Sequence, residues 1–420
     1  MKRVHYSWVI LFLTFFSIIV AGIVRSSSGV FVIPFEEEFQ WNRSMISFAF
    51  GLSLFIYGFS GPFMGAIVQS VGIKKMMLLS MGTLMLSLLL SLFMTEPWQL
   101  ILVWGVLNGL GASLFLTVLS PMIANTWFVK SRGLAVGILT ASTATGQLLL
   151  LPLLAYVIEV SNWKNAITII FILSMVMFIL IIFLMKDSPK RLGIPPYGGQ
   201  EETQTEAIPQ PKTNPFKMAL DVLFHAFKYK EFWLLAGSFF VCGLSTSGLI
   251  GTHFVSLCVS FGIAAVTAAS FLSIMGVFDL VGTTASGWLS DRVDNRWLLF
   301  WYYGLRGLSL LLLPFALSQG SYTMLIIFTV FYGLDWIATV PPTINIARNV
   351  FGLEKSVIIY GWIFAAHQVG AAVAAYGGGV LFEQYNTYIH AYIGAGVFCF
   401  LASLFVILIK KEHGSTKFEM

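Results

Sequence analysis

Runs of apolar residues, each about 20 residues long and separated by short polar segments, recur about a dozen times along the chain. An α-helix rises about 1.5 Å per residue, and the hydrocarbon core of a bilayer is about 30 Å thick. Each run can therefore cross a membrane once as a helix that makes all its backbone hydrogen bonds internally. The pattern predicts an all-α integral membrane protein with twelve transmembrane helices.

The expected helices fall into two sets of six. The first set covers residues 8–32, 44–68, 75–95, 98–124, 133–158 and 164–185, and the second covers 231–257, 264–289, 297–317, 321–347, 356–381 and 387–410. Residues 186–230 between the sets are rich in proline, glycine and charge, which is typical of a linker. We therefore expect an N-terminal six-helix bundle at 1–185, a cytoplasmic linker at 186–230 and a C-terminal six-helix bundle at 231–420. Within the linker, residues 216–232 are amphipathic and are expected to form a short helix at the membrane interface.

Composition and charge agree with this class of protein. Hydrophobic residues make up 57% of the chain, charged residues 10%, and the mean hydropathy is +0.85, which excludes an ordinary water-facing surface. Twenty Lys and Arg gather on the side of both termini and the linker, against two, Arg43 and Lys164, on the other side. Because basic residues accumulate in the cytoplasm, both termini are expected there, in a plasma or inner membrane. The net charge of +5 is thus a topology signal, and no nucleic-acid partner is expected.

The residues that usually mark an enzyme or a metal protein do not form such patterns here. Cys242, Cys258 and Cys399 lie in apolar runs without paired or metal-ligand spacing, so we interpret them as small buried hydrophobic residues. The sequence contains no Walker A motif. We therefore expect no catalytic activity, no cofactor and no metal.

The two sets of helices echo each other. Residues 26–29 read SSSG and residues 245–248 read STSG, and a pair of glycines nine residues apart occurs in a late helix of each set. Small residues are also common wherever membrane helices pack closely, which is the alternative explanation. Two repeats around a site at the membrane midplane would imply transport by alternating access.

A loop motif provides the first family resemblance. Residues 287–296, GWLSDRVDNR, resemble the G-x-x-x-D-R-x-G-R-[KR] loop of the major facilitator superfamily. The resemblance implies that Gly287, Asp291 and Arg292 belong to a gating loop, in which the acidic residue meets a neighbouring helix end and latches the cytoplasmic side. The alternative is that Asp291 and Arg292 form a solvated turn.

The corresponding loop of the first half departs from this pattern. Residues 65–75, GAIVQSVGIKK, keep the glycines, Gly65 and Gly72, and the terminal base, but Gln69 and Ser70 stand where the family has Asp-Arg. The N-terminal latch is therefore expected to be weaker than the C-terminal one.

A second motif indicates a branch of this superfamily. Residues 127–137, WFVKSRGLAVG, look like the W-F-x-x-[KR]-R-G-x-A-x-G stretch of monocarboxylate porters and oxalate/formate antiporters, and the resemblance covers nearly the whole chain. It implies two six-helix pseudo-repeat bundles and secondary transport. Monocarboxylate porters commonly carry an Asp and an Arg one turn apart in the eighth helix. Here Asp279 is present but Thr283 takes the place of the Arg, so the usual carboxylate clamp is missing.

Four charged residues remain deep in apolar runs: Arg25, Asp279, Arg306 and Asp335. An unpaired charge at the bilayer centre costs about 2.5 to 3.5 kcal/mol on insertion scales, so these side chains are expected to face the bundle interior or one another. Arg25 lies among small and hydroxylated residues, and its planar fork of donors suits a carboxylate. We interpret it as a substrate-binding residue, the alternatives being a structural or gating ion pair and a side chain that reaches the outer surface.

Arg306 is expected to have a different role. Its helix is peripheral in the superfamily it resembles, so a structural ion network with Asp279, Asp335 or both is the preferred interpretation. The alternative is a network that opens and closes with transport, in which either Asp could bind a coupling proton, because burial raises the pKa of a carboxyl group and a nearby Arg lowers it.

Three polar residues are candidates for the remaining lining of the site. His367 lies in the eleventh expected helix, and Thr143 and Gln147 lie at a related level of the fifth. They could line a central cavity from opposite halves of the protein. For His367, a hydrogen-bonded packing role is the alternative.

Together these features predict a secondary active transporter of a small organic anion, a monocarboxylate, that is coupled to protons or exchanges one anion for another. We expect it to act as a monomer within the lipid bilayer. One alternative is an exporter of a larger amphiphilic metabolite or drug, which the missing Arg of the eighth helix would favour. An alternative of another class is a receptor or scaffold that binds a ligand without moving it.

Overall fold

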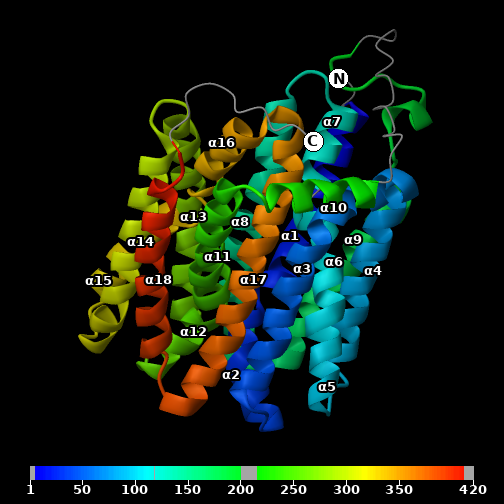
Figure 1. The fold of residues 1–420 in the computed structure, drawn as a ribbon. Coiled ribbons are helices and arrows are strands. Elements are labelled where there is room, and N and C mark those ends of the chain that lie inside the picture. Colours follow the sequence, from blue (N-terminus) through cyan, green and yellow to red (C-terminus); the bar gives the residue numbers. More distant parts are fainter. Residues whose placement is uncertain (1–4, 118, 200–214, 411–420) are drawn as a thin grey trace.

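The structure is a bundle of long helices that run up and down side by side (Figure 1). It is a computed structural model in which residues 5–117, 119–199 and 215–410 are described. That part of the chain contains no β-strand. The expected all-α membrane fold is therefore confirmed.

The elements follow the expected order. The first part of the chain contains α1 (Tyr6–Ser26), α2 (Ser28–Phe39), α3 (Arg43–Val71), α4 (Ile73–Ser91), α5 (Pro97–Leu100), η1 (Ile101–Leu107), α6 (Asn108–Thr117), α7 (Leu119–Trp127), α8 (Arg132–Val160) and α9 (Trp163–Leu184). The connecting segment contains η2 (Pro189–Leu192) and α10 (Pro215–Ala226). The last part contains α11 (Lys230–Gly243), η3 (Leu244–Ile250), α12 (Gly251–Ser260), α13 (Ala265–Ser290), α14 (Asn295–Ser318), α15 (Tyr322–Asp335), α16 (Val340–Phe351), α17 (Leu353–Tyr385) and α18 (Ile389–Ile407).

Twelve helical spans result from this order. Within the described residues, eleven stretches are long and apolar enough to cross a membrane. α8 has 29 residues and packs against α1 and α13, which makes it the remaining helix of spanning length. α1 begins and α18 ends at the same face of the bundle, as an even number of spans requires (Figure 1).

Four of the expected spans are interrupted. The first breaks at Ser27, between α1 and α2. The fourth and seventh contain the π-helical turns η1 and η3, and the tenth has a turn at residues 336–339 before α16 restarts. Pro341 and Pro342 follow that turn, where the first positions of a new helix tolerate the missing N–H groups. Such irregularities leave backbone groups of a membrane helix in need of other partners.

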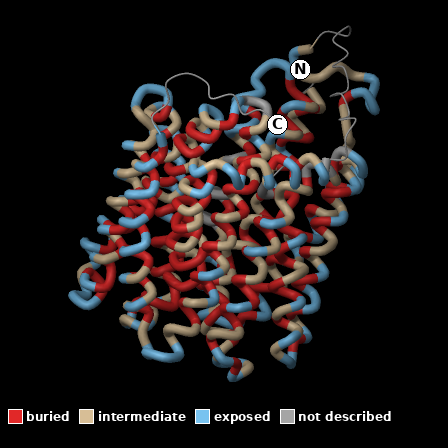
Figure 2. Tube along the Cα trace, in the orientation of Figure 1, coloured by how far each residue is buried: buried red, intermediate tan, exposed pale blue. Residues whose placement is uncertain are grey.

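The distribution of apolar side chains is that of a protein surrounded by lipid. Buried residues fill the interior of the bundle, while its outer face carries exposed residues throughout its height (Figure 2). Many of these are large and apolar; Phe93 and Phe183, for example, are 71% and 70% exposed. A water-soluble surface would not expose apolar area on this scale, whereas hydrocarbon surrounds it without penalty.

The two parts of the chain meet along three pairs of helices: α3 with α17, α8 with α13, and α2 with α12. The α3–α17 contact, which we call the seam, is the most extensive. Close backbone approach makes it possible: a Cβ atom added to Gly51 would lie 2.9 Å from the carbonyl oxygen of Ala372. Small residues at such positions allow helices to pack tightly in a bilayer.

The described part of the linker is folded against the bundle. Tyr197 accepts hydrogen bonds from the backbone N–H groups of Val129 and Lys130 at 3.0 and 3.1 Å, and its own N–H donates to Trp127 at 2.9 Å. Of the expected helix 216–232, residues 216–226 lie in α10, which runs across the bundle near its linker end (Figure 1). Residues 227–229 are not helical, and α11 begins at Lys230. Residues 200–214 lie outside the described part.

Candidate functional site

Arg25 lies at the break between α1 and α2, where both parts of the chain meet. Its Nη2 donates to Ser247 Oγ of η3 at 3.3 Å, and its guanidinium carbon lies 4.9 Å from the ring centroid of Tyr57 in α3. Its Nε is buried without a partner. In the described part of the chain, no carboxylate lies within ion-pair distance of it. The guanidinium thus keeps a free donor that a ligand could use.

His367 is joined to Arg25 by a series of aromatic contacts. The ring of Tyr57 lies 5.9 Å from that of Phe364, which in turn stacks on His367 at 5.6 Å. The ring of His367 also lies 4.9 Å from that of Phe239. The Nδ1 of His367 is buried without a partner. The structure therefore brings two of the candidate residues, one from each half, into one region.

Gln368 belongs to the same region and was missed by sequence reasoning. Its side chain packs against Gly58 across the seam, and its Oε1 is buried without a partner. The signal was available as a polar residue beside His367 in an apolar helix. Thr143 and Gln147 lie on α8, but their side chains are outside the described residues.

Arg306 forms an ion pair with Asp335. Its Nε lies 2.6 Å from Asp335 Oδ2, and its side chain is fully buried. Its Nη1 donates to Cys242 Sγ at 2.9 Å, and its Nη2 donates to the backbone carbonyls of Asp335 and Trp336. Arg306 therefore neutralises one carboxylate and also satisfies carbonyls where α15 ends.

Asp279 binds a backbone N–H group at the same break, where Arg306 binds backbone carbonyls. Its Oδ1 accepts from Thr283 Oγ1 and from the backbone N–H of Ile337, both at 2.9 Å. No ion pair joins it to Arg306 within the described residues. Thr283, which stands where monocarboxylate porters commonly have Arg, thus hydrogen-bonds to Asp279. Asp279 in turn stabilises the turn at residues 336–339. The expected network therefore consists of two separate sets of contacts: the ion pair between Arg306 and Asp335, and the hydrogen bonds by which Asp279 caps the turn.

The expected gating loop of the second half is exposed. The guanidinium of Arg292 lies 4.2 Å above the Trp288 ring, and its Nη1 donates to the Trp288 carbonyl at 2.9 Å. Asp291 makes no ion pair in the described part of the chain. The contact with the neighbouring helix comes one residue earlier, where Asn345 Nδ2 of α16 donates to Ser290 Oγ at 3.1 Å. The latch through Asp291 stays a prediction, and Gly287 has open space around it.

In the first half, an acidic residue of the linker meets the corresponding loop. Gly72 has a φ of +95°, a conformation that favours glycine. Asp187 Oδ1 accepts from the backbone N–H of Lys74 at 2.8 Å, and Asp187 also pairs with Arg191 at 2.9 Å. The Asp187 carboxylate thus contacts the loop from the linker, whereas residues 65–75 of the loop contain no acidic residue. The side chains of Gln69 and the environment of Gly65 lie outside the described residues.

At the opposite end of the bundle, Arg43 connects the two halves. It pairs with Glu36 at the end of α2, donates to Tyr388 Oη at 3.2 Å and lies 3.9 Å above the Phe382 ring. The next residue contributes too, because its backbone N–H donates to Glu383 Oε1 at 2.8 Å. We call this set the outer cluster. Sequence analysis used Arg43 only as a topology signal and gave no hint of these partners.

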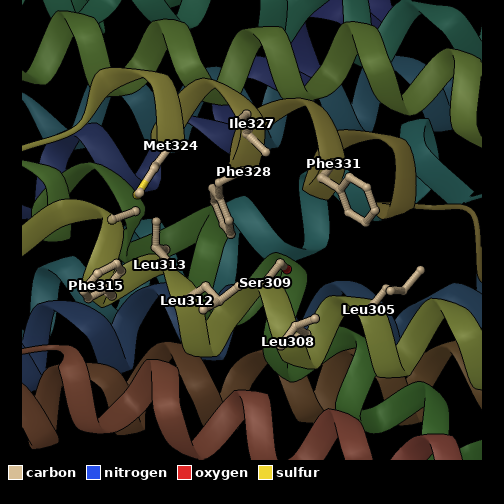
Figure 3. Close-up of a pocket in the computed structure, with 11 residues that line it drawn as sticks. Leu305, Leu308, Ser309, Leu312, Leu313, Phe315, Met324, Ile327, Phe328 and Phe331 are labelled. Carbon is tan, nitrogen blue, oxygen red and sulfur yellow. The ribbon is translucent and has the colours of Figure 1, made fainter. Parts of the chain in front are cut away.

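A groove on the surface of the described bundle is apolar rather than a polar site. It lies between α14 and α15, and its walls are aliphatic and aromatic apart from Ser309 (Figure 3). Exposed Leu312 and Phe331 line it on the side that faces lipid. An organic anion would lose its hydration there without gaining a partner.

Comparisons with known proteins agree with this architecture. The uncharacterized MFS-type transporter YcxA of Bacillus subtilis (strain 168) is 25% identical over 396 residues, which cover 91% of this chain and 90% of that protein. Monocarboxylate transporter 13 of Rattus norvegicus is 25% identical over 97% of this chain and 89% of its own. Monocarboxylate transporter 12-B of Danio rerio is 24% identical over 96% of this chain and 87% of its own. The family model of the Major Facilitator Superfamily matches residues 14–375 and 259–419, so the chain belongs to this superfamily of membrane transporters.

Proposed function

We propose that this transporter moves a small organic anion, a monocarboxylate, by alternating access. The observation that carries the proposal is the Arg25 guanidinium, which lies where α1, α3 and η3 meet and has a buried Nε without a partner. A guanidinium binds a carboxylate through two parallel hydrogen bonds. A single cation without a resident carboxylate suits a singly charged anion better than a dianion.

The surroundings of Arg25 support a substrate with an apolar body. Tyr57, Phe364 and His367 form a continuous aromatic wall beside it, and Gln368 adds a buried carbonyl oxygen without a partner. Two of the relatives are named monocarboxylate transporters, at about a quarter identity. Asp279 and Asp335 are candidates for a coupling proton, and exchange against a second anion is the other mode.

A second candidate is export of a larger amphiphilic metabolite. Thr283 supports it, because this residue hydrogen-bonds to Asp279 and offers no positive charge in the eighth span. In either case, the basic residues at the linker end of the bundle favour a cytoplasmic location for both termini, in a plasma or inner membrane.

A counterflow assay separates the candidates. Proteoliposomes loaded with unlabelled lactate, pyruvate, formate or oxalate are diluted into the labelled acid, and transient accumulation above equilibrium reports exchange through one site. We expect accumulation with the monocarboxylates and little with oxalate. Accumulation with none of the four acids would reject the anion assignment and leave the exporter. Saturable binding without flux, for any ligand, would identify a receptor.

A further inference from the structure

The outward face of α10 carries large apolar side chains that stay partly exposed in the described structure. Phe216, Leu220, Phe224 and Phe227 are between 39% and 62% exposed. The first three lie on the helix and, at 3.6 residues per turn, fall within an arc of about 80°, while Phe227 follows directly after the helix end. The opposite face is buried against the bundle through Ala219, Val222 and Ala226. The helix therefore has two apolar faces: one is buried against the bundle, and the other is largely exposed in the described structure.

Basic residues border the exposed apolar arc. Lys217 of α10 and Lys228, two residues beyond the helix end, are both exposed. On the helical projection Lys217 lies next to the Phe224 edge of the arc, with Asp221 slightly further round. An apolar face with Phe and Leu beside a basic edge is the arrangement of helices that lie in the plane of a membrane surface. α10 ends four residues before α11 begins and lies across the bundle at its linker end (Figure 1). The chain therefore holds this face at the level of lipid headgroups.

The same helix bridges the seam between the two halves. Phe216 stacks on Phe63 of α3 with ring centroids 5.3 Å apart, and Trp362 Nε1 of α17 donates to the Ala219 carbonyl at 3.0 Å. The ends of α3 and α17 on this side can separate only if α10 releases one of them. A force that holds α10 in place therefore opposes opening of this end.

We propose that the outward face of α10 docks into the cytoplasmic leaflet of the membrane, with anionic lipid headgroups on Lys217 and Lys228, and that docking holds the linker end of the seam closed. The apolar arc supplies the insertion, and the two lysines supply the preference for anionic lipid. This regulation is independent of which substrate the central site binds.

Docking is measured with a fluorophore on the full-length protein. A bimane label is attached to Phe224→Cys in a background of Cys242→Ser, Cys258→Ala and Cys399→Ala, and the protein is placed in nanodiscs of phosphatidylcholine or of phosphatidylcholine with phosphatidylglycerol. We expect acyl-brominated lipid to quench the label, and aqueous iodide to lose access to it when phosphatidylglycerol is present. Neutralising the lysines, Lys217→Gln and Lys228→Gln, should lower the ratio of docked to undocked helix about fivefold per residue.

Matched controls decide whether the effect belongs to α10. Lys75→Gln with Lys190→Gln removes the same charge from the same side of the protein, from exposed positions off the helix, and should leave the phosphatidylglycerol effect unchanged. Soluble glycerol phosphate should not reproduce it. Equal loss in the control, reproduction by glycerol phosphate, or a label shielded from both quenchers would overturn the proposal, the last by indicating a protein partner.

The effect on the seam is measured separately. Nitroxide labels replace Val71 at the end of α3 and Val357 near the start of α17, both exposed. Double electron–electron resonance should give a narrower distribution of label-to-label distances with phosphatidylglycerol than without it. The lysine double variant should abolish this difference. Docking without any change in this distribution would overturn the coupling to the seam. Neither measurement depends on transport, so failure of the anion assignment would leave both results interpretable.

Discussion

At the scale of single residues, the fully buried Arg306 shows how a membrane protein retains a charge. Its pairing with Asp335, 2.6 Å away, leaves that carboxyl group dependent on the guanidinium. Arg306→Leu strands the carboxyl group in a low dielectric and should lower stability by roughly 3 to 5 kcal/mol. Adding Asp335→Asn should restore part of the loss, whereas adding Asp279→Asn should not. Thermal unfolding in detergent measures all three, and rescue by Asp279→Asn instead would contradict the observed pairing.

The exposed arginine Arg292 provides the control for this series. Arg292→Leu removes the same charge from a loop at the surface and should change stability by no more than about 0.5 kcal/mol. An equal loss in both single variants would mean that stability responds to net charge rather than to the buried pair.

Sequence reasoning identified four charges within the apolar runs and named Asp279 and Asp335 as possible partners of Arg306, without deciding between them. That Arg25, Asp279, Arg306 and Asp335 would avoid lipid follows from the cost of an unpaired charge in hydrocarbon. Which carboxylate pairs with Arg306 depends on how two helices are rotated about their axes. Because apolar residues lie on all sides of α14 and α15, the sequence pattern does not determine that rotation. The separate role of Asp279 depends on a break in the tenth span, which Pro341 and Pro342 mark in the sequence but which the expected helix 321–347 passed over.

Arg25 gives a prediction about affinity. Arg25→Lys keeps the charge and loses the planar fork, so we expect affinity for a transported monocarboxylate to fall about tenfold or more, with expression and thermal stability close to those of the parent. Counterflow at varied substrate concentration measures it. Unchanged affinity in both Arg25→Lys and Arg25→Ala would remove this residue from the site.

At the scale of elements, the turn at residues 336–339 is stabilised by two charged side chains that bind backbone groups. Asp279 accepts from the N–H of Ile337, while Arg306 donates to carbonyls of Asp335 and Trp336. Asp279→Ala removes the acceptor and should destabilise the turn by about 1 to 3 kcal/mol. Asp279→Asn keeps a carbonyl oxygen there and should lose less. Hydrogen exchange of peptides covering 336–339 measures the difference, and equal exchange in the two variants would show that the cap does not hold the turn.

The hydrophobic pattern predicted the spans well and their interruptions not at all. The expected helix 44–68 is α3, Arg43–Val71, and the expected helix 264–289 is α13, Ala265–Ser290. Span ends are marked by polar residues and glycine, which the sequence displays. A π-turn or a two-helix span keeps the same apolar composition through the break, so η3 and the turn at 336–339 leave no trace in that pattern.

At the scale of the whole molecule, the outer cluster joins the two halves at one end of the bundle. Arg43 and Ser44 of the first half bind Tyr388 and Glu383 of the second, at the end opposite the linker. Alternating access requires the two ends to open in turn, so these contacts must break once in each cycle. The family resemblance implied a latch on the cytoplasmic side, whereas the structure shows contacts between the halves at the end opposite the linker, through residues that no motif marks.

Loss of these contacts should favour opening to the outside. A hydrogen bond to a charged group contributes about 1.5 to 3 kcal/mol, so Arg43→Gln should raise the population of outward-open molecules about tenfold or more. Ser47→Cys, at a buried position next to Gly379 across the seam, reports it through the rate of alkylation by an impermeant maleimide in the background without native cysteines. The control is Lys164→Gln, which breaks an exposed ion pair with Glu38 inside the first half and should have little effect. Alkylation that stays slow in Arg43→Gln, or rises equally in the control, would show that the outer cluster does not hold the two halves together.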